Sequence, residues 1–262
     1  MADRFLTRDG ATIAYDITGE GPLVGYAHGV FLSRAAVRRL ELLDLDALGE
    51  GRRLLTYDQR GHGRSTGRPL AADYRFEGFT ADLLGVLDAV APGEPIDFTG
   101  SSLGCAVALH AAVAAPERFG RLVVMIPPVA WESGPNPARQ WYTDAAEQIE
   151  REGAPAWRAA WAAADPLPIF ADYPKFDMTP EIPDELLAPI LRGIGESDLP
   201  SPEAVATITA PTLILTWDTD PLHPVDTAER LHELLSDSRL HVARSPGDVQ
   251  TWSRRIGEFL AE

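Results

Sequence analysis

The sequence predicts an α/β fold in which a mostly parallel central sheet is flanked by helices. Short apolar runs bounded by turn residues recur along the chain, and their length and Val, Ile and Leu content suit buried strands. Segments with helical spacing lie between several of them, and strands that alternate with helices form a parallel sheet covered on both faces. The expected strands are residues 12–15, 23–27, 53–57, 96–99, 122–126, 212–217 and 240–243.

Helical spacing is clearest in two of the intervening segments. Across residues 76–90, apolar side chains recur at Phe79, Leu83, Val86 and Val90, which places them on one face of a helix. Residues 105–115 are almost wholly apolar and begin with Cys105, the sole cysteine of the chain. We therefore expect helices at both positions, and no internal disulfide.

The alternation of strands and helices stops near Pro127 and resumes near Pro211. We therefore expect a core made of residues 1–127 and 211–262, and a helical cap inserted over residues 128–210. Two interpretations of the cap's aromatic residues stay open: the rings form the cap's own core, or they line a pocket for an apolar ligand. The second interpretation assigns the substrate pocket to Trp131, Trp141, Trp157 and Trp161.

The composition is acidic, because 39 Asp and Glu outnumber 23 Lys and Arg and give a formal net charge of −16. Such a protein repels phosphate backbones and anionic lipids, so we expect no nucleic-acid partner and no membrane association. The first residues lack the apolar core of a signal peptide, and no stretch approaches the ~18 apolar residues of a membrane span. The sequence predicts a cytoplasmic protein with a small-molecule substrate, and it leaves the oligomeric state open.

Residues 100–104, with the sequence GSSLG, lie between a predicted strand and a predicted helix. They fit the G-x-S-x-G pattern, in which a nucleophilic serine occupies a strained strand-to-helix turn. The residues two before and two after the serine come into close contact, so only very small residues fit there. Ser102 has Gly100 and Gly104 at these positions, whereas Ser101 has a threonine and a leucine. Ser102 is therefore the predicted nucleophile.

Two further motifs lie upstream of this turn. His28-Gly29 follows one predicted strand, and residues 58–65, with the sequence DQRGHGRS, follow the next. Together with the serine turn, these motifs closely resemble the α/β-hydrolase fold family over nearly the whole chain, including the position of the helical cap. The resemblance implies an oxyanion hole formed by the backbone N–H groups of Val30 and Leu103. It implies no cofactor, and the sequence shows neither a phosphate-binding loop nor a metal-ligand cysteine pair.

The same resemblance implies a catalytic acid and a catalytic histidine. Residues 211–217 look like the family's seventh strand, and the acid of that pattern directly precedes Pro-x-x-Pro, which selects Asp220 and leaves Asp218 as the fallback. The family's histidine usually follows the last strand in a Gly-x-Gly-His loop, where it accepts the serine proton. Here the last strand is followed by residues 245–248, with the sequence SPGD, so Asp248 stands where histidine is expected.

Three candidates for the proton acceptor stay open. His28, beside the oxyanion strand, and His223, three residues after Asp220, could each face the pocket. Asp248 could instead pair with Asp220, because burial and mutual repulsion raise one pKa of such a pair so that it holds a proton. Asp248 also has a structural interpretation, in which Ser245 and Asp248 form a capping box at the start of the final helix.

The function expected from these observations is that of an enzyme acting on a small, largely apolar carbonyl compound, nominally by ester or lactone hydrolysis. In a serine hydrolase, loss of the histidine costs on the order of a million-fold in turnover. Two alternatives therefore stay open. One is a non-hydrolytic cyclase, lyase or isomerase that uses carboxylates or the oxyanion hole, and the other is a catalytically inactive protein that binds a small ligand.

Overall fold

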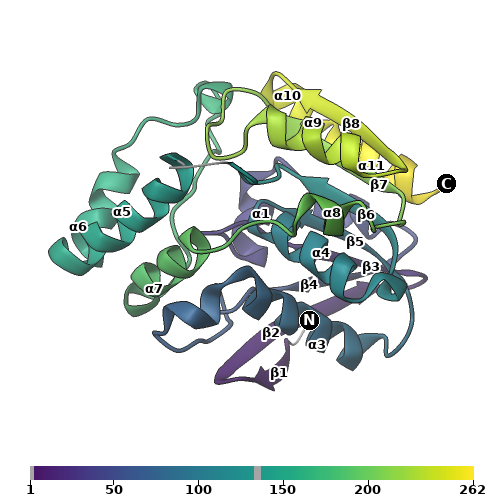
Figure 1. The fold of residues 1–262 in the computed structure, drawn as a ribbon, viewed down its shortest axis with the longest axis horizontal. Helices are drawn as coiled ribbons and strands as arrows, with labels where there is room; N and C mark the ends of the chain where they lie inside the picture. The colour runs from purple at the N-terminus through teal and green to yellow at the C-terminus, as the bar shows by residue number, and fades with distance from the viewer. Residues whose placement is uncertain (1–2, 133–136) are drawn as a thin grey trace.

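An eight-stranded sheet forms the centre of the molecule (Figure 1). The computed structural model describes residues 3–132 and 137–262, and within these ranges the strand order is β1-β2-β4-β3-β5-β6-β7-β8. β2 runs antiparallel to both of its neighbours, and the other neighbouring strands are parallel. The strands are β1 (Arg4–Arg8), β2 (Ala11–Gly19), β3 (Leu23–Ala27), β4 (Arg53–Tyr57), β5 (Ile96–Ser101), β6 (Phe119–Met125), β7 (Thr212–Trp217) and β8 (Ser238–Ala243).

Helices cover both faces of this sheet, which confirms the predicted fold class (Figure 1). One face packs against α3 (Phe76–Val90), α4 (Leu103–Ala114) and α9 (Val225–Leu234). The other face packs against α1 (Arg34–Leu40), α2 (Leu45–Leu48), α10 (Pro246–Gln250) and α11 (Trp252–Leu260). Two short 3-10 helices, η1 (Ala71–Tyr74) and η2 (Pro116–Arg118), lie in the connections before α3 and β6.

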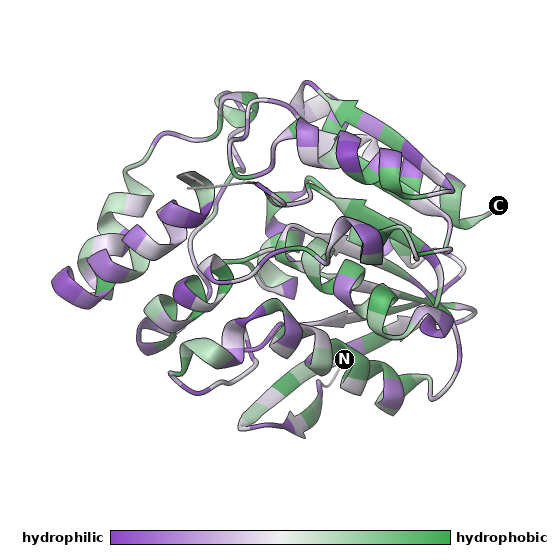
Figure 2. Cartoon of the chain, viewed as in Figure 1, coloured by the Kyte–Doolittle hydropathy of each residue, from purple (hydrophilic) through white to green (hydrophobic). Residues whose placement is uncertain are grey.

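The side chains of the central strands alternate between the two cores. In β6, Leu122 and Val124 belong to the core under α3 and α4, whereas Val123 and Met125 belong to the core under α1 and α11. Burial of each such side chain stabilises the fold by roughly 1.5–3 kcal/mol. This two-sided burial explains why the central strands appear in the sequence as continuous apolar runs, and Figure 2 shows these strands among the most hydrophobic segments of the chain.

A helical segment interrupts the core between β6 and β7. It contains α5 (Pro137–Glu152), α6 (Ala154–Ala162), η3 (Pro168–Phe170), α7 (Asp184–Gly195) and α8 (Pro202–Val205). α5 packs against α6 and α7, and these three helices lie apart from the sheet (Figure 1). α8 instead packs against α4 and α9, so the last part of this segment lies against the helices of the core.

Strand β1 has no counterpart among the strands predicted from the sequence. It is an edge strand, paired with β2 on one side, and its residues are exposed or half-buried. Phe5, for example, is 54% exposed. A strand that buries so little carries no apolar run for a sequence pattern to detect. Within the described residues, no helix is long and apolar enough to cross a membrane.

Candidate active site

The turn between β5 and α4 holds Ser102 in a strained conformation. Its backbone has φ 52° and ψ −111°, a region that costs a non-glycine residue on the order of 1–3 kcal/mol. The two flanking glycines make the turn possible. A Cβ on Gly100 would lie 2.1 Å from the carbonyl oxygen of Gly104, and one on Gly104 would lie 2.2 Å from the carbonyl oxygen of Ala27. The local geometry therefore matches the prediction that distinguished Ser102 from Ser101.

A histidine lies within hydrogen-bond distance of this serine. Ser102 Oγ is 2.8 Å from His223 Nε2, and His223 Nδ1 is 2.7 Å from Asp220 Oδ2. Because a carboxylate can only accept, Nδ1 carries the hydrogen that bonds to Asp220 and Nε2 presents a lone pair to the serine hydroxyl. The three side chains thus form a continuous chain of hydrogen bonds from serine to histidine to aspartate.

A tight loop after β7 brings Asp220 and His223 to the serine. β5, β6 and β7 are adjacent parallel strands, so their carboxyl ends meet at the same edge of the sheet. The Asp220 carboxylate accepts the Leu222 N–H at 2.9 Å, and the Asp220 carbonyl accepts the His223 N–H at 3.2 Å. These bonds fold the loop back on itself, and this places both side chains on the same side of Ser102.

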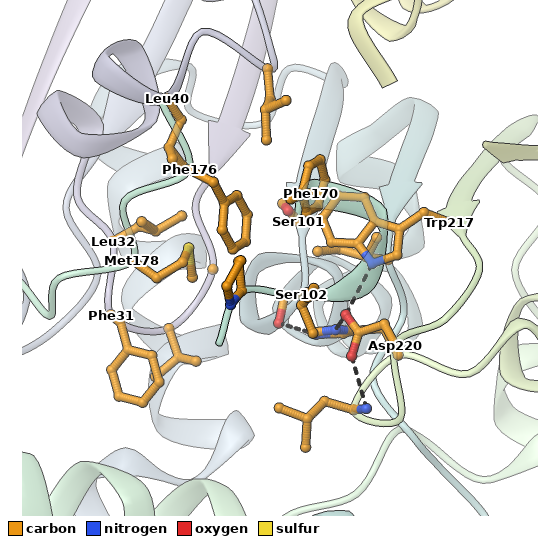
Figure 3. Close-up of a pocket in the computed structure, with 18 of the residues that line it drawn as sticks. Phe31, Leu32, Leu40, Ser101, Ser102, Phe170, Phe176, Met178, Trp217 and Asp220 are labelled. Carbon is orange, nitrogen blue, oxygen red and sulfur yellow. Dashed lines mark hydrogen bonds and ion pairs between the residues drawn. The ribbon is translucent and has the colours of Figure 1, made fainter. Parts of the chain in front are cut away.

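The carboxylate of Asp220 is held in its charged form. The Asp220 side chain is 1% exposed, and burial alone would raise its pKa. Three neighbours outweigh that effect: the electrostatic attraction and hydrogen bond of His223, the Trp217 Nε1–H at 3.0 Å, and the Leu222 N–H. Together they lower the pKa of Asp220 to about 2. Figure 3 shows Ser102, Asp220 and Trp217 on the same side of the cavity, with a dashed line from Trp217 to Asp220 for the hydrogen bond between them. A charged Asp220 keeps the His223 ring in the tautomer that can accept a proton.

The other proposed bases lie in structural positions. His28 is fully buried, its Nδ1 is 2.8 Å from the Gly29 carbonyl oxygen, and its Nε2 accepts the Gln59 N–H at 3.0 Å. Both ring nitrogens are therefore occupied, and burial lowers the pKa of His28. His62 lies against it, with ring centroids 5.4 Å apart, and burial lowers the pKa of His62 to about 3.

Asp248 is not brought to the serine either. Its carboxylate accepts the Arg244 N–H at 3.0 Å at the start of α10, and it does not line the cavity beside Ser102. Ser245 is the N-cap of this helix, because its Oγ accepts the Asp248 N–H at 3.2 Å. The structural interpretation of this segment therefore matches the geometry, and the hypothesis of a carboxylate pair between Asp220 and Asp248 is wrong in this structure.

The expected oxyanion donors lie beside the serine. Gly29 packs against the turn, since a Cβ on Gly29 would lie 3.3 Å from Ser102 Cβ. Val30, which follows it, and Leu103 both line a small cavity that also touches Ser102. Leu103 is the first residue of α4, so its N–H has no acceptor within the helix and lies at the positive end of the helix dipole. Within the described residues, neither N–H donates a hydrogen bond to another protein group.

Comparison with known proteins identifies the family of this chain. A sequence model of the alpha/beta hydrolase family matches residues 25–252. The chain belongs to the alpha/beta hydrolase family. A 2-hydroxy-6-oxo-2,4-heptadienoate hydrolase from Pseudomonas putida is 29% identical over 243 residues, which cover 82% of this chain and 80% of the relative. The 3-oxoadipate enol-lactonase 1 from Acinetobacter baylyi is 25% identical over 259 residues, which cover 90% of this chain and 86% of the relative.

A solved structure gives the same result. A hydrolase from Pseudomonas aeruginosa superposes with a TM-score of 0.80, at 26% sequence identity, over 99% of this chain and 97% of that protein. The resemblance inferred from the serine turn and the two upstream motifs is therefore confirmed at the level of family and fold.

In this alpha/beta hydrolase, a cavity of about 1000 Å³ opens beside Ser102. Two of the four predicted pocket residues, Trp141 and Trp161, line it. Trp157 does not, because it is buried in the helical segment and stacks on Trp161 with ring centroids 5.4 Å apart. Trp131 does not either, and its Nε1–H donates to the Pro200 carbonyl at 2.8 Å. Trp141 and Trp161 therefore line the pocket, whereas Trp157 belongs to the core of the helical segment.

Most of the residues that form the cavity wall are not predicted by any pattern in the sequence. Figure 3 shows side chains from α1, from the loop before it and from the helical segment arranged around Ser102. These residues are far apart in the sequence and carry no shared pattern. The apolar residues that form this wall include Phe31, Leu32, Leu40, Phe170, Phe176, Met178, Trp217 and Trp252.

Phe31 joins the oxyanion loop to the helical segment. It has φ 70°, an uncommon conformation for a non-glycine residue, and it directly follows Val30. Its carbonyl accepts the Glu181 N–H at 2.7 Å, and its ring lies 5.8 Å from Trp157 and 5.0 Å from Trp161 between centroids. The helical segment therefore helps to fix the backbone of the loop that carries the Val30 N–H.

Proposed function

We propose that this alpha/beta hydrolase hydrolyses a small, largely apolar carbonyl compound, namely an ester or a lactone. In this proposal Ser102 is the nucleophile, His223 the general base and Asp220 the residue that orients the histidine. The observation that carries the proposal is the hydrogen-bond chain from Ser102 Oγ through His223 to Asp220 Oδ2, at 2.8 and 2.7 Å. The relatives support it as well, because two of them are named as a hydrolase and a lactonase.

The chemistry follows from the positions of these groups. His223 Nε2 accepts the Ser102 proton as Oγ attacks the carbonyl carbon of the substrate, and the carbonyl oxygen takes up the electron pair. The N–H groups of Val30 and Leu103 stabilise that oxyanion, and each such donor is worth roughly 3 kcal/mol of barrier. His223 then gives its proton to the leaving alcohol. In the second half of the reaction, His223 takes a proton from a water molecule that attacks the acyl group, and it returns this proton to Ser102 Oγ as the acid leaves.

A serine-reactive phosphonate and a p-nitrophenyl ester test this function together. We expect wild-type protein to hydrolyse the ester and to be labelled stoichiometrically at Ser102, and we expect Ser102→Ala to lose both properties. Asp248→Asn is the matched control, because it retains an oxygen acceptor for the Arg244 N–H and lies outside the proposed machinery. Folded protein that is neither labelled nor active, yet binds apolar ligands, would instead identify a binding protein. Turnover that survives Ser102→Ala would identify a non-hydrolytic or carboxylate-based reaction.

A further inference from the structure

The charged side chains that line the cavity in the described part of the chain are acidic. Among the described residues that line it, no lysine or arginine occurs, and residues 133–136, which lie outside the described ranges, are Ser, Gly, Pro and Asn. Besides Asp220, the charged residues that line the cavity are Glu132, Asp165 and Asp177, and all three are exposed. The carboxylates therefore lie where the cavity meets solvent, and its interior is formed by apolar and aromatic side chains.

The interior offers little to a charged substrate. Leu32, Phe170, Phe176 and Met178 surround the space in front of Ser102 (Figure 3), and Leu40 extends this apolar wall away from the serine. A volume of about 1000 Å³ is at the upper end of the range for small-molecule sites, ~300–1,000 Å³, so there is room for a long or branched hydrocarbon group. A carboxylate placed there would lose its water without gaining a cation, which is costly.

One arginine lies near Ser102, but it lines the small cavity and not the large one. Arg139 lines the small cavity next to Ser102 and Leu103, and it forms an ion pair with Asp198. That carboxylate neutralises its charge. The large cavity therefore has exposed carboxylates at its mouth, and the Asp220–His223 pair beside Ser102 is the one charged group among the described residues of its interior.

We infer that the substrate of this enzyme is an ester or lactone whose hydrocarbon part is uncharged, and that the cavity selects against substrates that carry a carboxylate. This inference rests on the proposed function, because it concerns the same site. It adds a discrimination by charge that the catalytic residues themselves do not provide.

A pair of substrates of equal length tests the inference. p-Nitrophenyl octanoate and the mono-p-nitrophenyl ester of suberic acid differ only in a carboxylate at the far end of the chain. We expect kcat/KM for the neutral ester to be at least about 100-fold higher, because the anionic chain must enter past the carboxylates and lose water inside. Equal values, or faster hydrolysis of the anionic ester, would overturn the inference and leave the proposed hydrolysis intact.

A variant that adds a cation to the cavity tests whether the missing positive charge causes the preference for the neutral ester. Met178 is half-buried and lines the cavity beside Leu32 (Figure 3). We expect Met178→Arg to lower the ratio of kcat/KM for the neutral ester to kcat/KM for the anionic ester by about 10-fold or more, because the arginine supplies a positive charge for the carboxylate. Met178→Gln is the matched control, since it adds polarity without charge and leaves the ratio close to that of wild type. A ratio unchanged by Met178→Arg would count against selection by charge inside the cavity.

Binding separates a failure of this inference from a failure of the proposed function. The same two esters can be titrated into Ser102→Ala, where quenching of the cavity tryptophans Trp141, Trp161, Trp217 and Trp252 reports binding without turnover. We expect the neutral ester to bind at least about 100-fold more tightly. If wild-type protein proves inactive, this titration still decides between the two substrate classes, and equal affinities overturn the inference.

Discussion

His223 Nε2 lies 2.8 Å from Ser102 Oγ, although the two residues are 121 positions apart in the sequence. His223 belongs to the loop after β7, three residues beyond the aspartate that holds its other nitrogen. In the family pattern the histidine comes from the loop after the last strand, and in this chain that loop has become the start of α10. The serine, histidine and acid are thus assembled from two loops instead of three.

Two histidine variants separate a structural role from the proposed catalytic one. We expect His28→Ala to lower the free energy of unfolding by about 2–4 kcal/mol, since it leaves a void and an unpaired Gln59 N–H in the core. We expect His223→Ala to cost about 1–2 kcal/mol of stability, because the buried Asp220 loses one partner but keeps the Trp217 and Leu222 N–H donors, and to lower kcat for ester hydrolysis by 10⁴-fold or more. Thermal unfolding and p-nitrophenyl ester hydrolysis measure the two effects. A stable His28→Ala protein with abolished turnover would assign the base to His28 instead.

Asp220→Asn should keep the fold and lose most of the activity. An asparagine amide can turn its N–H₂ toward His223 Nδ1, which favours the tautomer that presents N–H instead of a lone pair to Ser102. We expect kcat to fall by about 10⁴-fold. Asp218→Asn, in the same loop, is the control, since Asp218 does not line the cavity. Loss of activity in Asp218→Asn with normal activity in Asp220→Asn would make Asp218 the acid.

The same aspartate should make stability depend on pH under acidic conditions. Its pKa falls from the ordinary value of 3.8 to about 2 in the folded protein, so the charged form stabilises the fold. That contribution, about 2 kcal/mol, is fully present above pH ~4 and is lost as the pH falls through ~2. Denaturant unfolding of wild type and Asp220→Asn should therefore differ at pH 7 and converge near pH 2. A difference that is constant across this range would contradict the lowered pKa.

Two glycine-to-alanine variants test the geometry of the serine turn. Gly100→Ala places a methyl group 2.1 Å from the Gly104 carbonyl oxygen, so we expect a loss of about 3 kcal/mol or more of stability and a displaced Ser102. Gly257→Ala, in α11, meets nothing within 4 Å and should stabilise the protein by about 0.5–1 kcal/mol. Chemical denaturation measures both. A Gly100→Ala protein as stable as wild type would mean that the turn is looser than described.

The features that can be predicted from the sequence depend on neighbouring residues. β3, β4 and β7 begin and end at the predicted residues, because each is a short apolar run buried on both faces. The sharp turn at Ser102 follows from residues within two positions, since Gly100 and Gly104 approach each other too closely for a side chain.

The features missed or left open depend on contacts between distant segments. The sequence alone does not decide between His28 and His223 as the base. No local pattern shows that the ring of His28 bonds to the Gln59 N–H and the ring of His223 to Ser102 Oγ. Trp157 and Trp161 are only four residues apart, yet one is buried in the helical segment and the other lines the cavity. Composition shows that rings are present, but tertiary packing decides where they point.

In the proposed mechanism His223 takes the proton of Ser102, and the rate of Ser102 phosphonylation depends on this step alone. The second-order rate constant should be measured with a p-nitrophenyl phosphonate for wild type, His223→Ala and Asp248→Asn under identical conditions. We expect His223→Ala to react at least about 1,000-fold more slowly than wild type, and Asp248→Asn to react at the wild-type rate. Wild-type reactivity in His223→Ala would show that another group activates Ser102, and loss of reactivity in Asp248→Asn would identify that group as Asp248.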